Sequence, residues 1–243
     1  MIDLHSHILP ELDDGAQSLE ESLAMARMAV DSGVTDMVAT PHCMGERSRE
    51  VMDAYHFLRE ALWEANIPLN LHPGMEIFGS HAAARMLKEG KLLTLNGSRY
   101  PLVEFAFLSD GEEETVILRS LLRAGYRPVA AHTERYSYIQ QMPQLINLWH
   151  KMGCLMQINR GSLLGRFGSR AQFSAMELVE RGFAAVVASD AHSYVMRTPW
   201  MADAEELLAE RISPLCQRTL LLDNPMKILR NEEVLPAEPE WFE

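Results

Sequence analysis

The stretch SLEESLAMARMAVDSGVTDMVAT, residues 18–40, contains a complete helix followed by a strand. Ser18 and Glu21 form a capping-box pattern, and apolar residues recur at helical spacing, which predicts a helix over 19–31. A glycine then closes the helix, and the apolar run at 34–40 predicts a strand. This unit sets the pattern for the rest of the chain.

The same alternation of short apolar runs and helical stretches recurs along the sequence. Strands are expected at 3–5, 34–40, 69–77, 100–105, 128–132, 155–159 and 184–189. Helices are expected at 19–31, 51–65, 112–124, 143–152 and 171–181. Seven strands that alternate with helices predict parallel strands with right-handed crossovers, in either an open doubly wound sheet or a closed barrel.

Length and composition indicate a single folded domain. The chain has 243 residues, of which 47% are hydrophobic and 23% charged, and these fractions exclude a disordered or fibrous protein. No Gly/Ser linker, charge block or low-complexity tract divides it, so we expect one domain over 1–243, with residues 236–243 as a loose C-terminal tail. The net charge of −12 argues against bulk nucleic-acid binding.

The sequence also predicts a cytoplasmic protein. Residues 1–10 lack the basic and apolar regions of a signal peptide, and no stretch has the roughly 18 apolar residues that span a bilayer. Three scattered cysteines, Cys43, Cys154 and Cys216, fit free thiols in a reducing compartment.

Residues of metal-ligand type gather where the predicted strands end. Because the carboxyl ends of parallel strands meet on one face, side chains far apart in sequence are expected to converge there. His5 and His7 are two residues apart, so on a strand both imidazoles face the same side and can bind one cation. The candidate ligands are five histidines and four carboxylates: His5, His7, Asp14, His42, Glu76, Glu104, His132, Asp190 and His192.

The number and type of these side chains predict a polynuclear metal site. A single histidine is more often an ordinary core or surface residue, but five of the nine histidines lie at strand ends. Nine ligands exceed the needs of one ion, which implies two or three ions. Mixed imidazole and carboxylate donors without a thiolate cluster favour manganese, iron or zinc.

Several motifs resemble those of a known enzyme superfamily. DLHSH at residues 3–7, Thr-Pro-His at 40–42 and Ser-Asp-Ala-His at 189–192 resemble motifs of the polymerase and histidinol phosphatase (PHP) superfamily. Within that superfamily, the chain from residue 1 to about 230 is similar to the bacterial capsule and exopolysaccharide tyrosine-protein phosphatases. The motifs that carry this similarity lie at 1–15, 74–77, 131–136 and 157–164.

This resemblance implies a distorted (β/α)7 barrel of PHP type with three metal ions, usually manganese. The implied ligand sets are His5, His7, Glu76 and Asp190 for one ion, Glu76, Glu104 and His132 for a second, and Asp14, His42 and His192 for the third. The resemblance also implies that Arg135 and Arg197 bind the phosphate. The implied substrate is the phosphotyrosine-rich tail of a membrane tyrosine autokinase that controls capsule or exopolysaccharide synthesis.

Phosphomonoester hydrolysis also fits these residues on chemical grounds. Paired cations lower the pKa of bound water and neutralise phosphate charge, and arginine gives phosphate two parallel hydrogen bonds. A phenolate leaving group needs little proton assistance. We therefore expect a metal-bound hydroxide as the nucleophile, without a covalent intermediate.

Three alternatives compete with this prediction. Cys43 and Arg49 have the spacing of the cysteine-phosphatase loop, although Gly45 lies one position too early for that motif. A small-molecule phosphatase of the same superfamily, acting for instance on histidinol phosphate, would use the same ligands. A non-catalytic metal- or phosphoprotein-binding module would be expected to have lost one or more of the nine.

A glycine-rich stretch follows the sixth predicted strand. Gly161, Gly165 and Gly168 alternate there with Arg166 and Arg170. The stretch lacks the lysine and hydroxyl residues of a nucleotide-binding loop, so we expect a turn that leads into a helix. It emerges on the active face, where it could contact substrate.

Overall fold

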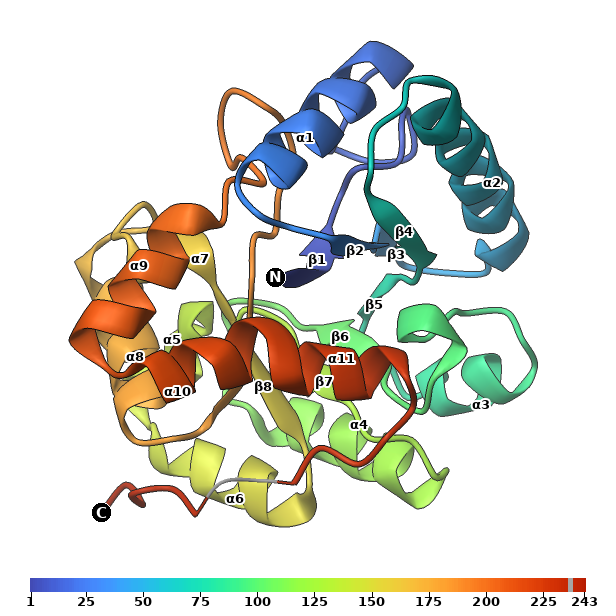
Figure 1. Ribbon diagram of the computed structural model, residues 1–243. Coiled ribbons are helices and arrows are strands. Elements are labelled where there is room, and N and C mark those ends of the chain that lie inside the picture. The colour runs from blue at the N-terminus through green and yellow to red at the C-terminus, as the bar shows by residue number, and fades with distance from the viewer. Residues whose placement is uncertain (236–237) are drawn as a thin grey trace.

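The computed structural model describes residues 1–235 and 238–243, and within them every strand pairing is parallel (Figure 1). One sheet has the order β1-β2-β4 and the other has the order β3-β5-β6-β7-β8-β9. The strands are β1 (Ile2–Ser6), β2 (Asp36–Ala39), β3 (His42–Cys43), β4 (Asn70–Pro73), β5 (Glu76–Phe78), β6 (Leu102–Glu104), β7 (Val129–Ala130), β8 (Leu155–Asn159) and β9 (Ala184–Ala188).

Two of the seven predicted strands lead from one sheet into the other: the first is followed directly by a strand of the second sheet, and the other is divided between the two sheets. The apolar run at 34–40 forms β2, and the chain then continues past Pro41 into β3. The predicted strand at 69–77 is split into β4 and β5 at Gly74, where an added Cβ would lie 2.8 Å from the Val38 side chain. These breaks distort the barrel but preserve seven positions around it.

The first and last strands meet at a short seam. A bridge pairs Ser6 with Ala191, and backbone hydrogen bonds run from Asp190 N to His5 O (2.9 Å) and from His7 N to Ala191 O (2.8 Å). The seam brings the edges of the two sheets together on the side away from β4 and β5. The α/β class and the distorted seven-position barrel predicted from the sequence are therefore confirmed.

Helices surround the strands, as parallel connections require. Figure 1 shows α1 and α2 outside the three-stranded sheet, and the C-terminal α10 and α11 (red) across the front of the view. The α-helices are α1 (Leu19–Asp31), α2 (Ser48–Glu64), α3 (Ala83–Lys88), α4 (Glu112–Arg123), α5 (Ser137–Gln141), α6 (Gln144–Met152), α7 (Arg160–Leu163), α8 (Ser169–Glu180), α9 (Ala202–Arg211), α10 (Pro214–Arg218) and α11 (Asn224–Leu229). Three short helical turns complete the set: η1 (Leu95–Gly97), η2 (Thr133–Arg135) and η3 (Thr219–Asp223).

The five predicted helices correspond to α1, α2, α4, α6 and α8, with α1 matching at both ends. Ser18 caps α1 as predicted, because its side chain accepts a hydrogen bond from Glu21 N. Across residues 1–235 and 238–243, no helix is both long and apolar enough to cross a membrane.

Two apolar clusters pack on opposite faces of the strands. Met37 belongs to the larger cluster, under the helices, whereas its neighbour Val38 belongs to the smaller one with Leu102 and Val186. Ile228 of α11 closes the smaller cluster, which fills one end of the barrel. The opposite end, where the strands terminate, is left for polar side chains.

The C-terminal segment differs from the loose tail expected over 236–243. Pro236 and Ala237 lie outside the described residues. Beyond them, the Asn147 side chain hydrogen-bonds both the backbone N and O of Phe242, and the Phe242 ring stacks on Phe183 with centroids 5.2 Å apart. The segment is held because these contacts combine backbone hydrogen bonds with aromatic packing.

Candidate metal centre

All nine predicted ligands come together at the polar end of the barrel. Asp190, just after β9, is central among them: its Oδ1 lies 3.5 Å from His5 Nε2, 3.4 Å from His7 Nε2 and 3.6 Å from His192 Nδ1. The candidate donor atoms form three overlapping groups, and within each group all of them lie within 4.8 Å of one another. The groups are His5, His7 and Asp190; His42, Glu76 and Glu104; and His7, Asp14, His42 and His192.

The first group is completely buried. His5 Nε2 and His7 Nε2 approach to 3.3 Å, and Glu76 Oε2 lies 3.2 Å and 3.3 Å from them. Asp190 Oδ1 adds a fourth donor at similar distance. Two imidazole nitrogens and two carboxylate oxygens that converge in this way match a four-donor cation site.

The second group contains Glu76, whose Oε2 also lies beside the two histidines of the first group. His42 Nδ1 lies 3.0 Å from Glu76 Oε2 and 2.8 Å from Glu104 Oε1. His132 Nε2 lies 2.8 Å from the other Glu76 oxygen and 3.8 Å from Glu104 Oε2, so it borders this group as well. Glu76 therefore has the geometry of a bridging carboxylate.

The third group is the most open. Asp14 Oδ1 lies 3.5 Å from His42 Nε2 and 3.4 Å from His192 Nε2, and the Asp14 side chain is 66% exposed. Asp14 comes from the acidic loop between β1 and α1, whereas His192 follows β9. This side of the centre faces solvent, so a substrate can approach it here.

The donor set fits divalent cations. Glu76 Oε2 and His192 Nε2 are buried and have no hydrogen-bond partner among the described residues. A buried polar atom without a partner is costly, and coordination would satisfy both atoms. Imidazoles mixed with carboxylates suit manganese, iron and zinc alike.

The clustered groups shift one another's pKa values. Burial acts to lower the pKa of His7 and His42, but the neighbouring carboxylates outweigh it, so the pKa of His7 is well above its usual value and that of His42 is about 10. Burial acts to raise the pKa of Asp190, but His5, His7 and Arg197 outweigh it and hold that pKa well below its usual range. Burial and the nearby His7 lower the pKa of His192 to about 3, so this ring is neutral at neutral pH. Metals bind ionised carboxylates and neutral imidazoles, so Asp190 and His192 are already in the binding form, whereas coordination by His7 and His42 would release protons.

Sequence reasoning missed the residues that orient the ligands. Gln157 Oε1 lies 3.0 Å from His5 Nδ1 and accepts a hydrogen bond from His132 N (2.9 Å). Asn159 Nδ2 donates to Asp190 Oδ2. Both side chains are fully buried on β8, and hydrogen bonds of this kind fix the tautomer and orientation of metal ligands.

Asp13 has the same role for His7. Its Oδ2 lies 2.7 Å from His7 Nδ1 and accepts a hydrogen bond from His42 N (2.8 Å). Burial acts to raise the pKa of Asp13, but the His7 ring and the backbone N–H groups of Gly15 and His42 outweigh it, so the pKa is well below its usual value. The carboxylate is therefore charged and orients His7.

The two predicted phosphate-binding arginines lie beside this cluster. Arg197 Nη2 is 2.5 Å and Arg135 Nη1 is 3.5 Å from the same oxygen, Asp190 Oδ2. Their side chains are 30% and 21% exposed, so both guanidiniums border the ligand cluster and reach solvent. Arg197 has a φ of 32°, in the left-handed region, and its O accepts a hydrogen bond from His192 N.

Cys43 does not have the environment of a catalytic thiolate. The side chain is 1% exposed, and its Sγ donates to Gly45 O at 2.8 Å. Burial raises the pKa of the thiol, so it stays protonated at neutral pH. This geometry argues against the cysteine-phosphatase alternative.

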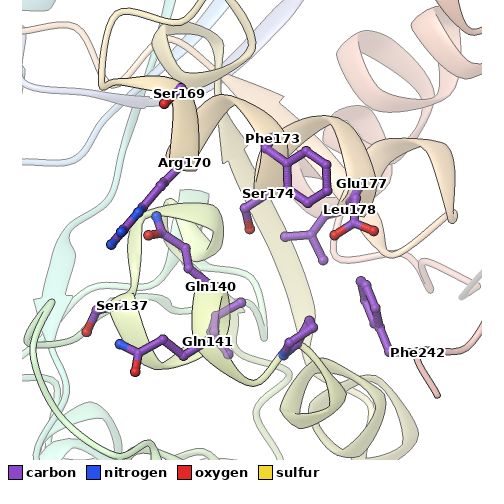
Figure 2. Close-up of a pocket in the computed structure, with 12 residues that line it drawn as sticks. Ser137, Gln140, Gln141, Ser169, Arg170, Phe173, Ser174, Glu177, Leu178 and Phe242 are labelled. Carbon is purple, nitrogen blue, oxygen red and sulfur yellow. The ribbon is translucent and has the colours of Figure 1, made fainter.

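A groove of about 890 Å³ lies between α5, α8 and the C-terminal segment (Figure 2). Ser137, Gln140, Phe173 and Phe242 are among its lining residues, and none of the nine predicted ligands is. In Figure 2 the Phe173 ring projects from α8 on the same side as Leu178. The groove is thus separate from the ligand cluster.

The fold and the site define the class: a parallel α/β-barrel protein with imidazoles and carboxylates clustered at the carboxyl ends of its strands, as in polynuclear metalloenzymes. Within this class, the chain belongs to the family described as capsular polysaccharide synthesis, CpsB/CapC, whose model matches residues 1–230. The resemblance inferred from the motifs is therefore confirmed.

Curated relatives extend over the whole chain. The tyrosine-protein phosphatase YwqE of Bacillus subtilis is 34% identical over 244 residues, covering 99% of this chain and 96% of the relative. The tyrosine-protein phosphatase CpsB of Streptococcus pneumoniae is also 34% identical, over 241 residues, covering 96% of this chain and 99% of the relative.

Solved structures agree with these relatives. A chain from the crystal structures of YwqE from Bacillus subtilis and CpsB from Streptococcus pneumoniae, described as unique metal-dependent tyrosine phosphatases, matches with a TM-score of 0.94 and 33% identity, covering 100% of both chains. A lactonase from Listeria monocytogenes matches with a TM-score of 0.61 at 13% identity, covering 96% of this chain and 95% of that one, and shows a shared fold alone.

Proposed function

We propose that this protein is a metal-dependent phosphatase that hydrolyses phosphotyrosine in proteins. The observation that carries the proposal is the convergence of nine imidazole and carboxylate side chains beside two arginines. Full-length relatives named as tyrosine-protein phosphatases support it.

The proposed ligand assignment is the one that the family resemblance implies. It keeps the first group of donor atoms but places His132, instead of His42, beside Glu76 and Glu104. His5, His7 and Asp190 would hold one ion, with Glu76 bridging to a second ion that Glu104 and His132 also bind. Asp14, His42 and His192 would hold the third. Manganese is our proposed metal, and iron or zinc would suit the same donors.

The arginines would bind the phosphate. Arg135 and Arg197 both reach Asp190 Oδ2, so their guanidinium groups converge on one small region beside the ligands. Each guanidinium can give two parallel hydrogen bonds to phosphate oxygens, which orients the group for in-line attack. Bound divalent cations would supply charge neutralisation and activate a water molecule at neutral pH.

The leaving group fits the residues present. A phenolate is far less basic than an alkoxide, so it departs without a strong general acid. His192 is neutral at neutral pH and would be bound to metal, so it does not serve as the proton donor. The site therefore suits an aryl phosphate better than an alkyl phosphate.

The finer parts of the proposal concern the partner and the setting. We propose the phosphorylated tail of a membrane tyrosine autokinase as substrate, in capsule or exopolysaccharide synthesis, with a cytoplasmic location for the phosphatase. The family description supports the link to capsule synthesis. The PHP-type motif DLHSH contributes His5 and His7 to the first donor group.

The test is phosphate release from a phosphotyrosine peptide by purified protein, with and without Mn²⁺. We expect activity that requires the metal, survives in Cys43→Ser and falls at least 100-fold in His192→Ala. Histidinol phosphate serves as the competing substrate. Preference for histidinol phosphate, or activity that resists chelation and disappears in Cys43→Ser, would overturn the proposal.

A further inference from the structure

The loop that connects α7 and α8 places an aromatic ring against both phosphate-binding arginines. The Arg135 guanidinium carbon lies 4.2 Å from the centroid of the Phe167 ring, and that of Arg197 lies 5.8 Å from the same centroid. Both distances are within the range in which a cation is attracted to the face of an aromatic ring. Phe107 also contacts Arg135, at 4.6 Å.

The glycine-rich stretch is what allows this placement. Gly165 and Gly168 have φ values of 75° and 89°, so the chain turns sharply on either side of Phe167. The ring folds back over Gly161, where an added Cβ would lie only 2.6 Å from Phe167 Cε2. Arg166 N donates to Gly161 O at 2.8 Å and closes the turn. The expected turn into a helix is confirmed, and it fixes the Phe167 ring.

The loop is also tied to the segment that carries Arg197. Arg160, at the start of α7, donates from Nη1 to Thr198 O (3.0 Å) and forms an ion pair with Asp203. Thr198 is the next residue after Arg197. The Phe167 loop and the Arg197 backbone therefore share one anchor.

The two cations need such support. Arg135 and Arg197 share one oxygen of Asp190, so their positive charges lie close together and repel each other. The negative face of an aromatic ring attracts both, and an apolar ring does not compete with phosphate for their N–H groups. A carboxylate in the same place would hold the arginines but would also repel the substrate.

We propose that Phe167 is a positioning residue that holds Arg135 and Arg197 together for binding a single phosphate group. The inference rests on the proposed function, because it takes the phosphate of the substrate as the ligand of the arginine pair. This role would explain the glycine-rich stretch around Phe167, which contributes no metal ligand and does not match a nucleotide-binding loop.

The test compares Phe167→Leu with wild type in two measurements. Calorimetric titration with inorganic phosphate gives the Kd at the arginine pair, and phosphopeptide hydrolysis gives kcat/KM. We expect Phe167→Leu to raise the phosphate Kd and lower kcat/KM by about the same factor, roughly 3- to 20-fold. Thermal stability and Mn²⁺ content should stay as in wild type.

Three further variants separate positioning from a general structural effect. Phe167→Tyr keeps the aromatic ring, so its phosphate Kd should equal that of wild type. Phe173→Leu makes the same change at a ring on α8 that is 66% exposed in the neighbouring groove (Figure 2), and it should have no effect. In a protein that already carries Arg135→Ala, adding Phe167→Leu should change the phosphate Kd and kcat/KM by less than about twofold, because most of the effect of Phe167 acts through Arg135.

Each opposing result has a distinct meaning. Full additivity of Phe167→Leu and Arg135→Ala would overturn the positioning role. A weaker peptide KM with unchanged binding of inorganic phosphate would also overturn it, and would place Phe167 against the substrate's phenyl ring instead. Wild-type protein that binds phosphate but does not hydrolyse the peptide would overturn the proposed function. The phosphate Kd of Phe167→Leu could still be compared with that of wild type, so the positioning role would remain testable.

Discussion

Replacing Gln157 by leucine should weaken both the fold and the metal centre. Gln157 is fully buried, and its Oε1 is the partner of His5 Nδ1 and of the His132 backbone N–H. The His132 N–H can donate only to the oxygen of the Gln157 amide, so this contact fixes the orientation of the amide. The same oxygen faces His5, so the Nδ1 atom of His5 carries the proton. Leucine keeps a similar volume but removes the acceptor from both donors.

The magnitude follows from those two donors. A buried donor left without a partner costs about 1–3 kcal/mol, so we expect the apoprotein to lose about 2–6 kcal/mol of unfolding free energy for the two donors. His5 also loses the contact that keeps its Nε2 free to coordinate. Removing such a supporting hydrogen bond typically lowers metal affinity about 10- to 100-fold.

The assay is urea unfolding of the chelator-treated protein, paired with calorimetric titration of Mn²⁺. Met156→Leu is the matched control, because Met156 is equally buried on β8 but belongs to the larger apolar cluster, under the helices. This exchange should lower the free energy of unfolding by less than about 1.5 kcal/mol. A loss below about 0.5 kcal/mol for Gln157→Leu, with unchanged Mn²⁺ affinity, would refute the reasoning.

Other substitutions test separate parts of the structure. Gly15→Ala would place a Cβ 2.1 Å from His7 O, so we expect a loss of about 1–3 kcal/mol in urea unfolding; a stability equal to wild type would contradict this close approach. Phe242→Ala should lower stability by about 1–2 kcal/mol in the same assay, because the ring stacks on Phe183, whereas a truly loose tail would show no change. Because burial raises the pKa of the Cys43 thiol, iodoacetamide at pH 7 should leave hydrolysis intact; rapid inactivation that Cys43→Ser prevents would show a reactive thiolate.

The parts of the fold that depend on local signals could be predicted from the sequence. The helix α1 begins after the Ser18 cap and ends before Gly33, where the capping box and the glycine indicate. The strand β8 matches its predicted range, because its apolar run is bounded by a glycine-terminated helix on one side. Alternation alone could not show how the run at 69–77 divides, since that break depends on Gly74 packing against Val38.

For the candidate site, the sequence could predict the metal ligands but not the residues that orient them. Nine candidate ligands could be proposed because their residue types are distinctive and all except Asp14 lie near the end of a predicted strand. Gln157 and Asn159 carried a weaker signal: polar residues two apart in an apolar strand, on the face that turns toward the ligands. The contact of Phe167 with two arginines was beyond reach, since it depends on three loops meeting in space.

The seam between β1 and β9 gives the metal centre a second consequence. His5 and His7 lie on one side of that seam and Asp190 lies on the other, although most of the chain separates them in sequence. A cation coordinated by all three would act as a cross-link between the first strand and the segment after the last strand, and closing so long a loop removes much of the unfolded chain's entropy. The ions that serve catalysis would then also stabilise the closed barrel. Loss of metal would destabilise the structure first at the seam where the first and last strands meet.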